Sequence, residues 1–157
     1  MARVVDRFEF LRADDTRLLA AMADLSDRSS GWINLLPGIP AEEEGSTRLP
    51  SSLGALFGTR QAPVTKCTWF PAPRSGRAEM KLGIMHPRQS KVVASLRESG
   101  LGVPEGWRVE QDHPRRGLIV RPPADAHAAA VMQWAMEAAL ALALVPVTGS
   151  WMAEVHR

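Results

Sequence analysis

The order of short strand patterns and longer helical patterns between residues 79 and 157 is the feature that most restricts the fold. Runs that alternate between apolar and polar residues, or are wholly apolar, predict strands at 79–85, 107–112, 117–120 and 150–155. Helical patterns separate them, one starting at Pro87 and ending near Ser99, the other following Asp125 to about Val145. The predicted order is therefore strand, helix, strand, strand, helix, strand.

That order is ferredoxin-like, a βαββαβ unit over about residues 79–157. The N-terminal half predicts a strand at 4–11, a helix capped by Asp14 and ending near Arg28, and strands at 32–36 and 64–70. A chain of 157 residues has the usual size of one domain. We therefore expect a single α+β domain over residues 1–157, with an N-terminal β-α-β-β extension on the same or a facing sheet.

A long connection at 37–63 interrupts this pattern. It contains several prolines and glycines and the acidic run AEEEGS. Connections of this length inside a compact domain are usually functional lids or disordered loops. We expect residues 40–50 to be mobile or lid-like, because like charges and low hydrophobicity oppose burial.

Composition favours a cytoplasmic protein without a disulfide. Cys67 is the single cysteine, and its place in the middle of a strand predicts an inert core thiol. The first residues carry charges and no long apolar run, so we expect no secretory signal there. The apolar stretch at 128–147 contains Gln133, Glu137 and much alanine, and it predicts a buried helix rather than a membrane span.

The charge balance is weak evidence for any partner. The net charge is +2, and acidic residues are interleaved with the basic ones. Stacking of bases on a sheet requires outward aromatic side chains. The outward strand positions predicted for residues 79–157 contain none, so nucleic acid is the weakest of the candidate partners.

One polar cluster follows from the βαββαβ order. The end of the first strand of that unit should lie beside the turn between its second and third strands, which would gather His86, Arg88, His113, Arg115 and Arg116. A helix beginning at Pro87 would add a positive dipole end. We expect a small anionic ligand, such as a carboxylate or phosphate, to bind there. Asp112 opposes this by neutralising one arginine.

Sequence patterns assign no catalytic residues, no metal and no cofactor. The chain contains no glycine-rich phosphate loop, paired-histidine zinc motif or Gly-x-Ser-x-Gly sequence. Two histidines without a third ligand do not make a zinc site.

The pattern at 125–145 predicts a helix that packs against other parts of the protein on two sides. Leu140 and Leu144 fall on the same stripe as Gln133 and Glu137, so its C-terminal end is apolar all round. We expect the N-terminal segment or a second copy of the chain to cover both leucines.

Together these features favour a non-catalytic small-ligand-binding or protein-interaction domain, with a homodimer through the 125–145 helix as one form. The alternative is a small-molecule enzyme that uses His86 and His113 as acid and base in a polar pocket. Nucleic-acid binding is a weaker alternative.

Overall fold

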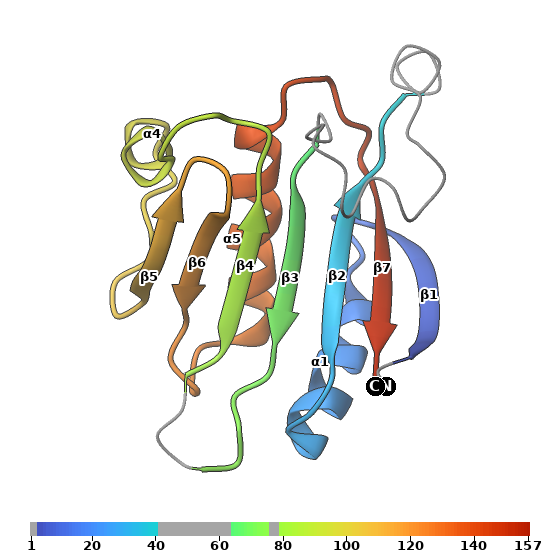
Figure 1. Ribbon diagram of the computed structural model, residues 1–157. Coiled ribbons are helices and arrows are strands. Elements are labelled where there is room, and N and C mark those ends of the chain that lie inside the picture. Colours follow the sequence, from blue (N-terminus) through green and yellow to red (C-terminus); the bar gives the residue numbers. More distant parts are fainter. Residues whose placement is uncertain (1–2, 41–63, 76–78) are drawn as a thin grey trace.

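The computed structural model describes residues 3–40, 64–75 and 79–157. Within these ranges the chain forms a mixed α/β domain with a seven-stranded antiparallel sheet and three helices (Figure 1). The elements, in chain order, are β1 (Val4–Leu11), α1 (Thr16–Arg28), β2 (Trp32–Pro37), β3 (Lys66–Phe70), β4 (Lys81–Met85), α4 (Val93–Glu98), β5 (Arg108–His113), β6 (Gly117–Arg121), α5 (Ala128–Leu142) and β7 (Ser150–His156). The connection at 40–50 that we expect to be lid-like lies almost wholly outside the described residues.

The strands lie in the order β1-β7-β2-β3-β4-β6-β5. All of the predicted strands are present, and the N-terminal strands join the same sheet. The segment β4-β6-β5 has the expected order. The ferredoxin-like arrangement is not confirmed, because it requires β7 beside β4, and β7 instead pairs with β1 and β2. β3 takes the place beside β4, since strands that follow one another in the sequence usually pair with each other.

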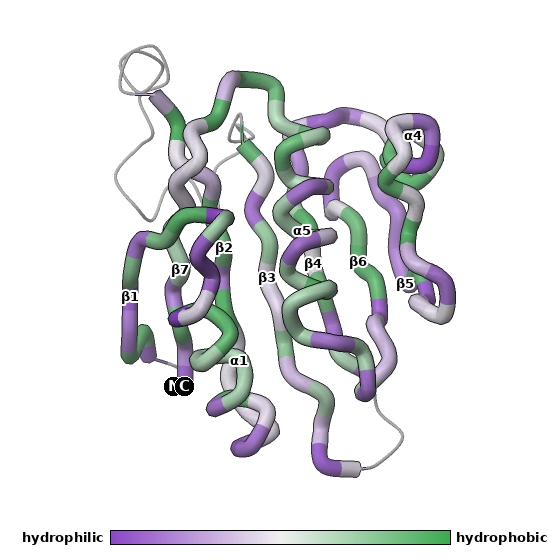
Figure 2. Tube along the Cα trace, turned by 180° about the vertical axis from the view of Figure 1, so that it is seen from behind, coloured by the Kyte–Doolittle hydropathy of each residue, from purple (hydrophilic) through white to green (hydrophobic). Residues whose placement is uncertain are grey.

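Two helices cover one face of the sheet. Figures 1 and 2 show α1 and α5 on the same side, with α5 crossing behind the central strands. Inward side chains of alternate strand residues meet them, and Trp69, Trp151 and Leu82 are among those almost completely buried. This burial of apolar surface is the main source of stability, at about 25 cal/mol per Å².

The same chain covers most of α5. Its apolar surface faces the sheet, α1 packs beside it, and the indole of Trp107 meets the edge of Trp134 with ring centroids 5.4 Å apart. The Trp134 indole N–H donates to the carbonyls of Leu101 and Gly102. Arg12 forms an ion pair with Glu137 on the polar stripe. Leu140 is half-buried, whereas Leu144 is 57% exposed, so the N-terminal segment does not cover Leu144, and its cover by a second copy stays a prediction. None of the described helices combines the length and apolarity that a membrane span requires.

Candidate ligand-binding face

The five residues of the predicted anion cluster lie at one end of the sheet. Ile84 pairs with Leu118, and His113 pairs with Gly117, so the end of β4 and the end of β5 flank the start of β6. His86 follows β4 directly. The expected neighbourhood of the two turns is therefore present, although His86 is buried and the side chains of Arg88 and His113 bond to the backbone of this chain.

His86 is buried and is not available to a ligand. Its side chain is 5% exposed, and neither ring nitrogen has a hydrogen-bond partner among the described residues. Burial lowers the pKa of His86, against the attraction of the nearby Asp112. The ring is therefore held neutral inside the protein.

Arg88 and His113 have structural roles at this end. The Arg88 guanidinium donates to the carbonyl oxygens of Ala141 and Leu142, which are orphan acceptors at the end of α5. His113 Nδ1 accepts the backbone N–H groups of Arg115 and Arg116, at 3.0 and 3.1 Å, and so closes the hairpin turn. The side chains of Arg115 and Arg116 are exposed.

The expected helix start at Pro87 is wrong. α4 begins at Val93, and the carboxylate of Asp112 accepts the N–H groups of Val92 and Val93 at 2.9 and 3.2 Å. Asp112 reaches them because the pairing of β5 with β6 shifts by one residue between Val109 and Gln111. Such a bulge reverses the alternation of side chains, so Asp112 faces the helix side and not the outward side that simple alternation predicts. The chain's own carboxylate thus occupies the N–H groups that an anion would use.

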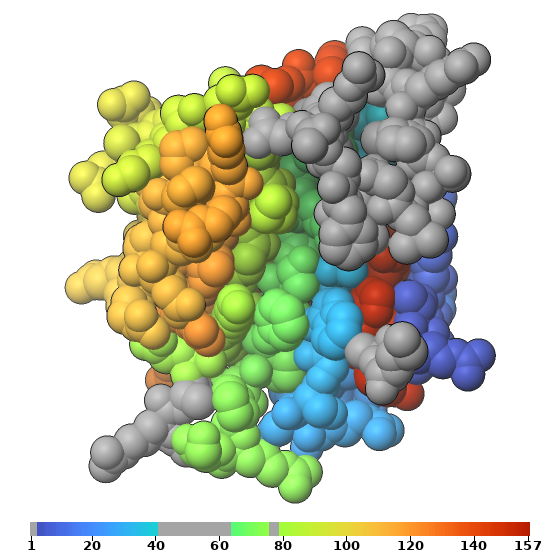
Figure 3. All heavy atoms as spheres, in the orientation of Figure 1, coloured from blue at the N-terminus to red at the C-terminus, as the bar shows by residue number. Residues whose placement is uncertain are grey.

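A second group of side chains lies on the face of the sheet without helices, which Figure 3 shows as spheres. Here His156 pairs with Trp32, and Lys81 pairs with Phe70. The pairing of Asn34 with Thr68 puts Trp32 opposite Phe70, and that of Leu82 with Val120 puts Lys81 opposite Arg121. We call this row across the sheet the aromatic–basic row: His156, Trp32, Phe70, Lys81 and Arg121.

The rings of the row stack along it. The imidazole of His156 and the indole of Trp32 are nearly parallel, with centroids 4.7 Å apart and an angle of 8°. The Trp32 and Phe70 rings follow at 6.0 Å and 35°. The ammonium of Lys81 lies 5.5 Å from the centroid of Phe70. Because β2 and β4 are the two neighbours of β3, Trp32 and Lys81 flank Phe70 from opposite sides.

A hydrogen-bonded chain lies beside the row on the same face of the sheet. The Asn34 side-chain amide donates to His156 Nε2 at 3.1 Å, and its oxygen accepts the hydroxyl of Thr68 at 2.9 Å. His156 Nε2 must then be unprotonated. Burial also lowers the pKa of His156, against the attraction of Glu154. The stack therefore contains a neutral imidazole in a defined tautomer.

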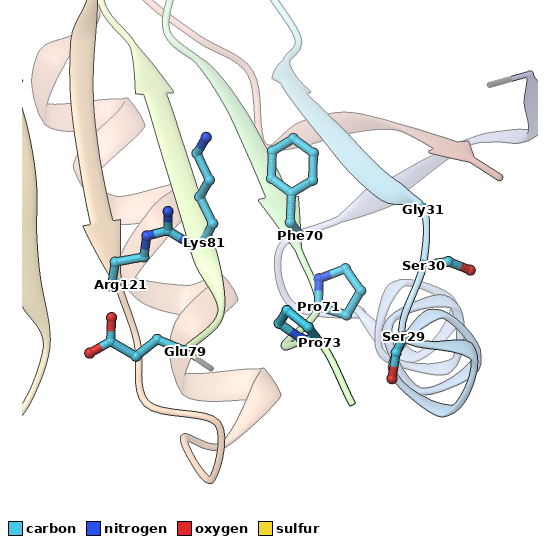
Figure 4. A pocket seen from close by; sticks show the side chains of 9 residues that line it. All are labelled: Ser29, Ser30, Gly31, Phe70, Pro71, Pro73, Glu79, Lys81 and Arg121. Carbon is cyan, nitrogen blue, oxygen red and sulfur yellow. The ribbon is translucent and has the colours of Figure 1, made fainter. Parts of the chain in front are cut away.

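A shallow depression of about 290 Å³ opens at the basic end of the row. Figure 4 shows Phe70, Lys81 and Arg121 on neighbouring strands, with Glu79 nearby and Pro71 and Pro73 below Phe70. The turn of Ser29, Ser30 and Gly31 lines its other side. Phe70 and the two prolines thus lie between the charged side chains and the serine turn.

The charges around the depression are mixed. Arg121 pairs with Glu110, and Arg108 pairs with Glu79 at 2.8 Å. Lys81 has no ion pair within 4.0 Å among the described residues. Three cations against two carboxylates leave a local surplus of one positive charge.

Sequence reasoning missed this face for an identifiable reason. Alternation in KCTWF already implies that Phe70 points away from Cys67 and Trp69. The sequence predicts an outward face only for residues 79–157, because it assigns β2 and β3 no definite place in the sheet. Cys67 is buried as expected, and burial raises the pKa of its thiol to about 12.

Comparisons add no relative. No family model matches the chain, and neither the curated proteins nor the solved structures contain a match. Among the described residues, no three His, Cys, Asp or Glu side chains gather in a way that could hold a metal ion.

Proposed function

We propose that this protein is a non-catalytic binding domain whose ligand is a small planar anion held at the basic end of the aromatic–basic row. The observation that carries the proposal is the row of neighbouring rings and cations on one face of the sheet, in which His156 stacks on Trp32 and Trp32 lies tilted beside Phe70. Of the five residues predicted for an anion site, His86 is buried and Arg88 and His113 bond to the backbone of this chain. We therefore propose that the small ligand expected from the sequence binds on the helix-free face and not at the end of the sheet that carries His86 and His113.

Stacking supports the planar part of the ligand. The rings of His156, Trp32 and Phe70 already form a series across three strands. The depression begins at Phe70, where the series stops. A planar group that displaces the Lys81 ammonium from Phe70 would extend the series by one ring, and such aromatic contacts contribute about 0.5–1.5 kcal/mol beyond their buried area.

Lys81 and Arg121 support the anionic part. Both reach the wall of the depression from adjacent strands (Figure 4). A hydrogen bond to a charged group contributes about 1.5–3 kcal/mol. Glu79 and Glu110 compete for these cations, so we expect modest affinity.

A second candidate ligand is single-stranded nucleic acid. The predicted strands of residues 79–157 have no outward aromatic side chains, but Trp32 and Phe70 supply them from β2 and β3. Lys81 and Arg121 lie beside these rings. Base stacking on aromatic side chains contributes about 1–3 kcal/mol per base and tolerates any sequence. An oligonucleotide and a mononucleotide share this chemistry, so the experiment must separate them.

The enzyme alternative has less support than binding. His86 is buried, and His113 Nδ1 is occupied by the backbone of its own turn. A homodimer through α5 also has less support, because α1 and the sheet already pack against that helix.

Isothermal titration calorimetry with four probes tests the proposal: adenosine monophosphate, adenosine, inorganic phosphate and oligothymidylate. We expect adenosine monophosphate to bind more tightly than adenosine or phosphate alone. Tighter binding of oligothymidylate, growing with its length, would favour the nucleic-acid candidate. Failure of every probe to bind, or equal binding of phosphate and the nucleotide, would overturn the planar-anion proposal.

Matched variants locate the binding. Phe70→Leu and Lys81→Gln should each weaken the nucleotide about tenfold, the equivalent of 1.4 kcal/mol. Gly83→Val should block the face without unfolding, because an added Cβ would meet only the Thr68 carbonyl oxygen, at 3.9 Å. Arg97→Gln on α4 removes an exposed cation elsewhere and should have no effect.

A further inference from the structure

The first strand of the chain forms one edge of the sheet. β1 pairs only with β7 among the described residues, and its outer side has no strand beside it. Val5 and Leu11 on this strand are 45% and 59% exposed. Edge strands with exposed apolar residues readily pair with another strand.

The backbone of β1 offers hydrogen-bonding groups to a partner. The Arg12 N–H donates to Gly149 oxygen, and the pairs between Asp6 and Leu11 follow without a shift. In an antiparallel pair these bonds alternate, so the even-numbered residues bond to β7. The N–H and C=O groups of Arg7 and Glu9 therefore point away from the sheet. The Leu11 carbonyl is not free, because it accepts the Asp14 N–H at 2.8 Å.

The side chains of β1 select a second copy of this chain as the partner. Arg7, Glu9 and Leu11 share the helix-free face, opposite Glu154, Met152 and Ser150. When two copies of β1 pair antiparallel about a twofold axis at Phe8, Arg7 of each lies opposite Glu9 of the other. Val5, at the register shift of β1, then lies near Leu11 of the other copy, so the two exposed apolar side chains are close together.

The two neighbouring registers are unfavourable. Shifting the axis to Arg7 would put two arginines opposite each other, and shifting it to Glu9 would do the same with two glutamates. Like charges directly opposite in a sheet are destabilising, whereas opposite charges contribute about 0.2–1 kcal/mol. Among these three registers, the charge pattern favours the one with its axis at Phe8. We propose that two copies of this protein associate through β1 in that register, joining their sheets edge to edge.

The helix side of the edge has room for the partner. A groove of about 490 Å³ lies between β1 and the start of α1, lined by Phe10, Leu11, Asp14 and Arg17 among others. In the proposed register Asp6 would approach Phe10 of the second copy. Its charge is already neutralised by Arg17, whose guanidinium lies 2.9 Å from the carboxylate. No unpaired charge would therefore be buried in the dimer interface.

The opposite edge of the sheet lacks these features. β5 contains a bulge between Val109 and Gln111, which interrupts its pairing pattern in the middle of the strand. Bulges of this kind protect edges from pairing. The corresponding shift in β1 lies at its beginning, between Val4 and Asp6, and leaves the remainder regular.

Sedimentation velocity over micromolar to millimolar chain concentrations tests the proposal. The contact consists of four backbone hydrogen bonds and two charge pairs, so we expect a weak dimer. The mass should rise from 17.1 kDa towards twice that value as the concentration increases. A protein that stays monomeric at millimolar concentration would overturn the proposal.

Charge reversal identifies the register. Arg7→Glu and Glu9→Arg should each abolish the dimer, whereas the double variant Arg7→Glu/Glu9→Arg should restore it, because the opposite charges then exchange places. The Arg7–Glu154 pair is lost both in Arg7→Glu and in the double variant, so its loss cannot produce this rescue. Arg97→Glu on α4 is the matched control. Dimerisation that survives both single reversals, or a double variant that stays monomeric, would refute this register.

A second pair of variants separates weaker association from unfolding. Val5→Lys and Leu11→Lys alter exposed side chains and should leave the thermal melt unchanged while weakening the dimer at least tenfold. Unchanged association in these variants would place any self-association elsewhere, for example at α5.

Discussion

The imidazole of His156, at the end of the last strand, stacks on the indole of Trp32, at the start of β2, with ring planes 8° apart. This contact joins residues from distant parts of the sequence, because β7 lies between β1 and β2. It also fixes one end of the aromatic–basic row. In this arrangement the His156 ring is neutral, because its Nε2 accepts the amide of Asn34.

Stability should fall in mild acid. Burial lowers the folded-state pKa of His86 and of His156 below the ordinary 6.5, so the unfolded chain binds more protons than the folded one. The stabilisation is complete above pH 6.5 and is lost as the pH falls from there towards the folded-state pKa values. Urea unfolding between pH 7.5 and pH 5 should show this loss.

Substitution separates the contributions of these histidines. His86→Leu removes two buried ring nitrogens that lack partners, so it should flatten the acid dependence and be neutral or stabilising by about 1 kcal/mol at neutral pH. His127→Gln, an exposed position before α5, is the control. An unchanged pH profile for both His86→Leu and His156→Gln would contradict the assignment.

Gly31→Ala should be strongly destabilising. The glycine has a φ of 85°, and an added Cβ would lie 2.3 Å from the His156 carbonyl oxygen. The expected loss exceeds about 2 kcal/mol, since a Cβ is disfavoured at positive φ and the backbone of β7 cannot move aside without disturbing the sheet. Gly100→Ala is a matched control with φ 79° and no atom within 4 Å. Equal losses in the two variants would show that the contact with β7 is unimportant.

Asp112→Ala should destabilise the segment that precedes α4. The carboxylate satisfies two backbone N–H groups there, and loss of a cap costs about 0.5–2 kcal/mol. Asp112→Asn keeps one acceptor and should lose less. Chemical denaturation measures both, and an alanine variant as stable as the parent would exclude the capping role.

Arg88→Ala and Arg116→Ala should behave differently. Arg88 bonds to the last carbonyl groups of α5, so its removal should cost about 0.5–1 kcal/mol, whereas Arg116 has an exposed side chain and its removal should be silent. Neither change should alter the effect of phosphate on the melting temperature. A phosphate-dependent stabilisation lost in the double variant would restore the anion site first expected at this end of the sheet.

Local patterns predicted the elements of this fold better than their arrangement. Alternation identifies Leu82 and Ile84 as inward, and both are almost completely buried. The position of β7 depends on which strand edge is free after β3 and β4 have paired, and no local pattern contains that information. The bulge in β5 likewise reverses Asp112 through pairing with β6.

For the predicted anion cluster, too, the sequence indicates where the residues lie but not which partners their side chains have. Topology correctly brought His86 and His113 to one end of the sheet, but the partners of each side chain decide what it can do. Those partners, such as the C-terminal carbonyls of α5 for Arg88, come from elements distant in sequence. Conversely, the row containing Trp32 and Phe70 exists only once β2, β3 and β4 are neighbours.

Nuclear magnetic resonance titration with adenosine monophosphate tests the central claim most directly. The five tryptophans supply separate indole N–H signals, and Trp32 is the one on the helix-free face of the sheet. We predict saturable shifts for the Trp32 indole and for the backbone amides of Phe70 and Lys81, with little change near His113. Shifts confined to the His113 turn, or no saturable shift on the helix-free face, would contradict the account.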